Sequence, residues 1–439
     1  MAAGARRILE ETPWGLLEDA YGPAEDAPGR LAALATPGRH AEALDYLHGS
    51  ILHQGTAHSA TPPVALFVIA LLAGPDVPSC LRPQLVEFLA HVAGPIASAL
   101  ANRVTLERLA TFDLEAFQAR AANPAEAEAL LAPYREILEA RGGSGEYGGL
   151  LEPDVLPFFI SGQAVDARGA LACLAIAPDL IAFFFDALEE PNPRSRTFAA
   201  MGAVRLAAAD PAGTHRDALS RRLRELLKVA GPDERAALVL TLGDLGEDTR
   251  AFMDDPAPGV RLCAALAARL AADPAAFALL RRALEEDAVR MELWFENRPP
   301  QFWARPRIEV VRRLIESARD FDDVADAAVA LARVPSLGFD ARDIDFTEDA
   351  TLTETLARLS ANTPSGGGVA DVEWGSLLAL AFSAGDGFVR SDAQRRYLRA
   401  LVARDDIWDP ELRNYSEWFD KAGLPHDRTA CARLAGIEA

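Results

Sequence analysis

The sequence predicts an all-α protein built from stacked pairs of antiparallel helices. Apolar residues recur with the period of a helix almost everywhere, and no segment shows a sustained alternation of apolar and polar residues. Proline and glycine also interrupt the chain about every 20 residues, so each predicted helix is short. Two such helices make a hairpin of about 40 residues, the length of a solenoid repeat.

The segment between Gly213 and Gly231 illustrates the helical spacing. Its apolar residues are separated by four, three, one and three positions, which places them on one face of a helix. These residues are Leu219, Leu223, Leu226, Leu227 and Ala230. Arg and Glu occupy the opposite face, so this helix is expected to cover a core on one side only.

Proline residues mark the expected helix starts, because proline fits the first turn and a preceding Asp can cap it. The marks are Asp210-Pro211, Gly231-Pro232, Asp255-Pro256 and Asp273-Pro274. Two glycine-rich segments, 141–149 and 363–368, are predicted to be flexible loops. With a further break at Pro299-Pro300, we divide the chain into N-terminal repeats (1–150), central repeats (151–296) and a C-terminal helical region (297–439).

The best-formed repeat runs from Asp255 to Leu284. A turn with Asp-Pro opens it, Val260-Arg261 follows, and an Ala-rich apolar helix comes next. Weaker copies begin near Asp166, Pro193 and Pro232. This order resembles the HEAT repeat, clearly over about residues 150–290. The resemblance implies an α-solenoid of irregular HEAT- or armadillo-like repeats, and it implies no particular activity.

Segments near both ends also resemble uncharacterised HEAT-repeat proteins of high-GC bacteria. They are residues 20–28, followed by 51–56, and residues 423–428. This resemblance extends the expected fold to the whole chain and brings no activity with it.

The charge balance and the cysteine positions limit the kinds of partner and the cellular compartment that we expect. The chain has 44 Lys and Arg against 65 Asp and Glu, a net charge of -21. Such a field repels phosphate backbones and anionic lipid, so we expect neither a nucleic acid nor a membrane as partner. It suits a basic protein, although solubility alone also explains it. The four scattered cysteines and the absence of a leading apolar segment predict a cytoplasmic protein.

One acidic cluster matches a catalytic pattern. Asp322, Asp323 and Asp326 have the DDxxD spacing that holds Mg²⁺ in all-α prenyl-diphosphate enzymes, and Asp320 adds a DxDD pattern. No second carboxylate-rich motif accompanies them. The other interpretation is a helix N-terminus, where Asp caps free amides.

The histidine and arginine groups are weaker candidates. His40, His48, His53 and His58 lack the i, i+4 or i, i+3 spacing of a helical zinc site, so we expect no metal and no cofactor. His53 to Thr56 reads as a helix end, with Gly55 in the left-handed position. Arg216 to Arg224 is the one basic stretch that could suit a DNA glycosylase of HEAT-like fold, and it covers a single helix face.

Two sets of residues are candidates for binding a partner. The first is a row of arginines near the expected starts of the second helices, at Asp166, Arg194, Asp233 and Val260. These arginines are Arg168, Arg196, Arg235 and Arg261. Alternatively, each pairs with an Asp of the neighbouring repeat and stiffens the stack; Arg261 would pair with Asp255.

The second set is aromatic and flanks the Pro-Pro break. It consists of Trp294, Phe295, Phe302 and Trp303. These rings either form a binding ridge or plug a joint between subdomains. Together these features predict a non-enzymatic scaffold that binds a basic protein or peptide on its concave face. The alternatives are an immunity protein or antitoxin for a basic toxin, and an Mg²⁺-dependent enzyme using Asp320 to Asp326.

Overall fold

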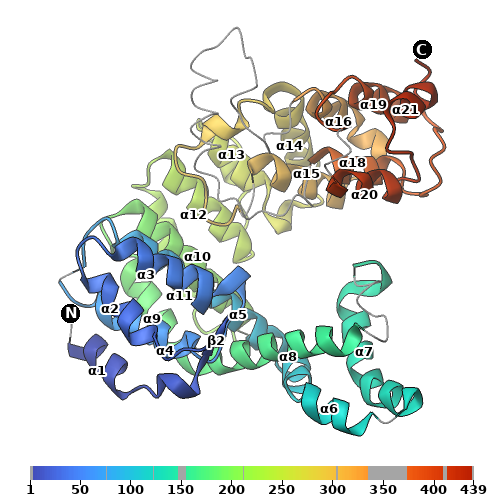
Figure 1. Ribbon diagram of the computed structural model, residues 1–439. Coiled ribbons are helices and arrows are strands. Elements are labelled where there is room, and N and C mark those ends of the chain that lie inside the picture. Colours follow the sequence, from blue (N-terminus) through green and yellow to red (C-terminus); the bar gives the residue numbers. More distant parts are fainter. Residues whose placement is uncertain are drawn as a thin grey trace. The chain divides into compact units, whose positions relative to one another are not determined.

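A computed structural model of the chain confirms the all-α prediction (Figure 1). It describes residues 3–75, 77–121, 123–146, 155–210, 212–302, 305–334, 373–408 and 413–437. Within these ranges, the one pairing of strands joins β1 (Glu18–Asp19) to β2 (Gly22–Pro23), antiparallel and two residues long. The chain forms two compact units, Met1–Glu225 and Leu226–Ala439. The divisions predicted near residues 150 and 296 concern repeats and remain predictions.

The first unit is organised around the long helix α5 (Arg82–Ala110). Helices α8 (Leu156–Cys173) and α10 (Pro193–Ala209) both pack along it, and α4 (Thr61–Leu72) lies between α5 and α1 (Ala3–Glu11). The other helices are α2 (Ala27–Ala32), α3 (His40–Tyr46), α6 (Leu114–Arg120), α7 (Pro124–Glu146), α9 (Ala177–Ala187) and α11 (Arg216–Leu227), whose last two residues belong to the second unit. Short helical turns connect them: η1 (Trp14–Leu16), η2 (Ala33–Ala35), η3 (Leu47–Ile51), η4 (His53–Gly55) and η6 (Leu174–Ile176).

Most of the described helices of the second unit pack against the next but one along the chain, whereas the first two pack against each other. They are α12 (Pro232–Asp244), α13 (Pro258–Ala265), α14 (Pro274–Asp287), α15 (Pro306–Ser317), α16 (Ala325–Ala332), α18 (Glu373–Ala381), α19 (Asp392–Val402), α20 (Arg413–Lys421) and α21 (Arg428–Leu434). One row consists of α14, α16, α19 and α21, and the other of α15, α18 and α20. The short turns here are η7 (Arg250–Phe252), η8 (Ala268–Leu270), η9 (Met291–Trp294) and η10 (Phe321–Asp323). One continuous core of buried side chains runs from Ala236 to Ala435.

Two of the predicted helix starts are confirmed, and one is shifted. α12 begins at Pro232 and α14 at Pro274, where the Asp273 carboxylate accepts the amides of the two residues after the proline at 2.8 and 3.3 Å. After Asp255-Pro256 the helix begins two residues later, at Pro258. Asp255 instead accepts the amide of Ala257 at 2.9 Å, which holds the turn before the helix. Pro211 lies outside the described residues.

One predicted helix start and one predicted loop are wrong, for the same physical reason. Asp166 lies in the middle of α8 and starts no helix. Residues 141–146, expected to be a loop, belong to α7; residues 147–149 and 363–368 lie outside the described residues. Neither stretch contains proline. A glycine inside a helix costs about 1 kcal/mol but leaves the hydrogen-bond ladder intact, whereas proline removes a donor.

Two stretches, Arg82–Ala110 and Leu156–Ala187, are long and apolar enough to cross a membrane by length and composition. Half and one third of their apolar windows are buried inside the protein. Core helices of soluble proteins pass the same test, so these stretches do not by themselves indicate a membrane protein.

Candidate functional site

Three of the four candidate arginines occupy the same position, the fourth residue of a helix. Arg196 donates from Nη1 to the carbonyls six and five residues before it, at 2.7 and 2.9 Å. Arg261 makes the same two bonds, at 2.8 and 3.0 Å. Arg235 donates to the carbonyl five residues before it at 3.4 Å. Each guanidinium therefore fastens the loop that leads into its own helix.

Arg235 also makes the ion pair that the ladder interpretation expects. Its Nε lies 3.0 Å from Oδ2 of Asp255, and its Nη2 donates to Oδ1 at 3.2 Å. The expected pairing of Arg261 with the Asp255 carboxylate is wrong, because Arg261 bonds the Asp255 carbonyl instead. The carboxylate thus joins the start of α12 to the turn before α13.

Arg168 does not belong to this series. It is exposed in the middle of α8, and its Nη1 donates to the carbonyl oxygens of Ala110 and Phe112 at 3.0 and 3.3 Å. Those carbonyls lie at and just beyond the end of α5, where the last turn of a helix leaves acceptors unused. Arg168 therefore caps α5.

The aromatic segment is largely turned inward. Phe295 and Phe302 are only 3% and 9% exposed, and their rings meet edge to face with centroids 5.8 Å apart. The Phe295 ring presses on Gly259, where a Cβ would lie 2.6 Å from a ring carbon. Trp294 is half-buried against the same core, and Trp303 lies outside the described residues. This burial favours the joint over an exposed ridge.

Three carboxylates of the acidic cluster have different partners: one caps a helical turn, and two form ion pairs with different arginines. Asp320 accepts the amide of Asp323 at 3.3 Å and caps η10. Arg319 pairs with Asp323 at 2.7 Å, and that hydrogen bond lowers the pKa of the Asp323 carboxyl to about 2. Asp326 pairs with Arg396 of α19 at 2.8 Å. Within the described ranges, no three His, Cys, Asp or Glu side chains come together as a metal site requires.

The histidines also separate. Nδ1 of His53 lies 2.9 Å from the carbonyl oxygen of Gly49, and Gly55 has a φ of +83°, as the predicted helix end requires. His48 instead meets His91 of α5, with ring centroids 6.1 Å apart. Burial lowers the pKa of both, that of His91 to about 4. This pair was not apparent from the sequence, because 43 positions separate the two histidines.

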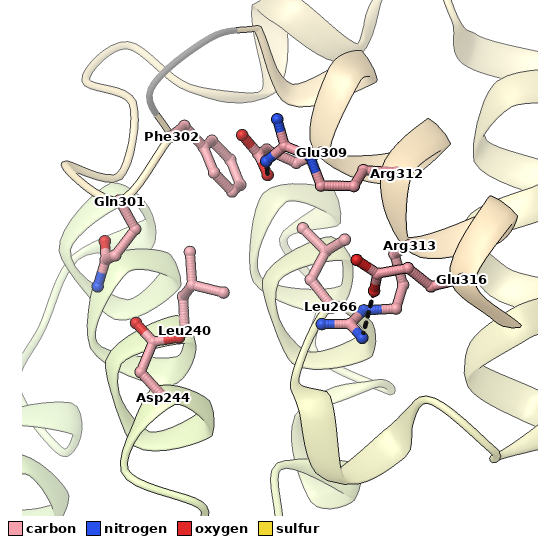
Figure 2. A pocket seen from close by; sticks show the side chains of 9 residues that line it. All are labelled: Leu240, Asp244, Leu266, Gln301, Phe302, Glu309, Arg312, Arg313 and Glu316. Atoms are coloured by element: carbon pink, nitrogen blue, oxygen red, sulfur yellow. Dashed lines mark hydrogen bonds and ion pairs between the residues drawn. The ribbon is translucent and has the colours of Figure 1, made fainter. Parts of the chain in front are cut away.

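A hollow of about 160 Å³ lies within the second unit, between α12, the end of α13, and α15 (Figure 2). Its apolar lining is Leu240, Leu266 and Phe302. Its polar lining is Asp244, Gln301, Glu309, Arg312, Arg313 and Glu316. Two ion pairs at 2.9 Å, Glu309 with Arg312 and Arg313 with Glu316, run along α15.

Gln301 is anchored on the α12 side of this hollow. Its Nε2 donates to Oγ1 of Thr241 at 2.6 Å, and the Thr241 hydroxyl in turn donates to the carbonyl of Ala237 at 2.7 Å. The threonine proton is therefore already used, which determines that the amide nitrogen of Gln301 faces it. This contact holds the segment after the Pro-Pro break against α12.

The nine lining side chains are three apolar groups, three carboxylates, two guanidiniums and one amide. Of these residues, sequence analysis singled out only Phe302. The sequence signal that could have indicated the hollow is the Pro299-Pro300 break, which is followed by a helix with closely spaced Arg and Glu residues. A comparison with protein-family models and with curated proteins finds no match for this chain.

Proposed function

We propose that this protein is a non-enzymatic, cytoplasmic scaffold of the HEAT-like α-solenoid kind that binds a basic protein or peptide. The observation that carries the proposal is the alternate packing in the second unit, where α15, α18 and α20 follow one another in one row and α14, α16, α19 and α21 in the other. Stacking of this kind is the arrangement of solenoid repeats, whose second helices line an extended binding surface.

The charge of the chain supports a basic partner. A net charge of -21 attracts cationic segments and repels nucleic acids and anionic lipid. An immunity protein that covers a basic toxin would be one form of this function. The division of the Asp320 to Asp326 carboxylates among a cap and two ion pairs supports binding over Mg²⁺ catalysis.

The proposal is tested by fluorescence anisotropy with two labelled peptides of equal length, one rich in Arg and Lys and one rich in Glu. We expect saturable binding of the basic peptide alone, weakening as salt is added because the attraction is screened. Equal binding of both peptides, or binding of neither, would refute a basic partner.

A further inference from the structure

Four aromatic rings from three elements of the first unit form one continuous contact. His48 of η3 meets Phe88 of α5 edge to face, with ring centroids 5.9 Å apart, and its centroid lies 6.1 Å from that of His91 on the same helix. His91 in turn meets Phe198 of α10, with centroids 6.3 Å apart. The two histidines therefore connect η3 to the packing between α5 and α10.

The backbone of η3 brings His48 to this place. η3 is a single π-helical turn, in which the amide of Leu52 donates to the carbonyl of Leu47, five residues earlier, at 3.1 Å. Such turns are rare, and they are frequent at functional sites. Leu47 and Ile51 are buried, whereas His48 is exposed and His91 is half-buried. Protons from the solvent can therefore reach the two rings while η3 stays folded.

Both histidines are mostly uncharged at pH 7. Burial lowers the pKa of His48, and burial together with the nearby Arg205 guanidinium lowers the pKa of His91 to about 4. Arg205 is held beside His91, since its Nη1 donates to the carbonyl oxygen of Ala90 at 3.0 Å. Charging both histidines would place His91 next to two other cations, His48 and Arg205, and like charges in one site disfavour each other.

Two carboxylates lie near these rings and oppose an effect of acid. Asp45 of α3 attracts a charged His48. Glu87 of α5 pairs with Arg194 of α10 at 3.2 Å, and burial raises the pKa of Glu87. A carboxyl with a raised pKa binds its proton more tightly in the folded chain, so acid stabilises the fold through Glu87. A histidine with a lowered pKa has the opposite sign, and an opening in acid must therefore come from the histidines.

We propose that the contact between His48 and His91 is acid-sensitive: it holds η3 on α5 at neutral pH and releases η3 when both rings become charged. Release uncovers Leu47 and Ile51, which are buried at neutral pH. This property is independent of the proposed scaffold function, because the contact lies in the first unit and the stacked rows of helices lie in the second.

Hydrogen–deuterium exchange of the full chain, followed by mass spectrometry on peptides that cover residues 40–52, measures the release. Exchange at pH 7 and at pH 5 is compared after correction for the intrinsic rate of unprotected amides. The main variant is His91→Phe, which keeps an aromatic ring that cannot be charged, and the control is His40→Gln at the start of α3. His48→Gln is a second variant, at the more exposed ring, and circular dichroism shows whether each variant is folded.

In the wild type, we expect the corrected exchange of residues 40–52 to increase between pH 7 and pH 5. The contribution of His91 is at most about twentyfold, for a pKa that changes from about 4 in the contact to about 6.5 after release. His91→Phe should remove most of the increase and His48→Gln part of it, while His40→Gln should respond as the wild type does.

Three results would overturn the proposal. One is an equal response to acid in the wild type and in the folded variants of His91 and His48. Another is a wild type whose exchange over residues 40–52 does not change between the two pH values. The third is an equal loss of protection in α5 and α10 at pH 5, because it would show unfolding of the whole unit rather than release of η3.

Discussion

The ion pair between Arg235 and Asp255 should be a measurable source of stability in the second unit. Asp255 has two roles, because it accepts the Ala257 amide at 2.9 Å and pairs with Arg235. Loss of a helix-start acceptor costs about 1 kcal/mol. The two side chains are only 25% and 12% exposed, so the pair belongs near the top of the range of about 0.2–1 kcal/mol for surface pairs.

These contributions predict that Asp255→Ala lowers the free energy of unfolding by about 2 kcal/mol. That loss corresponds to a fall in melting temperature of about 4–8 °C for a unit of this size. Arg235→Ala should cost about 1 kcal/mol, because it keeps the amide contact of Asp255. The double variant should lose about 1 kcal/mol less stability than the sum of the two single-variant losses, and this difference is the coupling energy of the pair.

Urea unfolding followed by tryptophan fluorescence is the suitable assay, because five of the six tryptophans lie in the second unit. Asp254→Ala, a change of the neighbouring exposed carboxylate, should leave the midpoint almost unchanged. A coupling energy below about 0.3 kcal/mol, the scatter of independent sites, would refute a stabilising pair. The arginine row would then be better explained by partner binding.

Three further predictions concern packing, thiol exposure and charge. Gly169→Ala should destabilise the first unit by about 3 kcal/mol or more, because the new Cβ would lie 1.7 Å from a carbonyl oxygen of the loop ahead of α4. Gly162→Ala is the control, because a Cβ at this position of the same helix has open space. An equal fall in melting temperature in both variants would count against the packing argument. A thiol reagent should label Cys80 quickly and the three buried cysteines only on unfolding, since burial raises the pKa of two of them to about 12 and that of the third above its usual range. Asp323→Asn should lower the urea midpoint at neutral pH. The difference in midpoint between the variant and the wild type should shrink as pH falls from about 4 to about 2, because Arg319 lowers the pKa of Asp323 to about 2 in the folded chain and protonation then removes the pair. A difference in midpoint that does not depend on pH would exclude the charge as its cause.

The helices were predictable wherever a local signal marks their ends. Pro232 and Asp273-Pro274 start helices as expected, because proline and a capping carboxylate act within one turn. Asp166 was misplaced since no proline or cap accompanies it, and the buried face of α8 continues through it. A degenerate repeat pattern is therefore a weaker guide to boundaries than the chemistry of a helix end.

The candidate site was less predictable, because it depends on elements distant in the sequence. Only Phe302 of the hollow was singled out, and as part of a ridge or a joint. Asp244 carries no special pattern in the sequence. It lines the hollow only because α12 ends beside α15, whose first residue lies more than 60 positions further along the chain.

The sequence by itself determined that this chain is all-α, because helical hydrogen bonds and apolar spacing are local properties of a few turns. Only the tertiary structure decided which side chains meet. Phe295 packs against Gly259, and Asp255 pairs with Arg235 rather than with Arg261. Asp323 and Asp326 form ion pairs with two different arginines. Such contacts depend on how helices stack, and many sequences with the same periodicity allow different stacking partners for one residue.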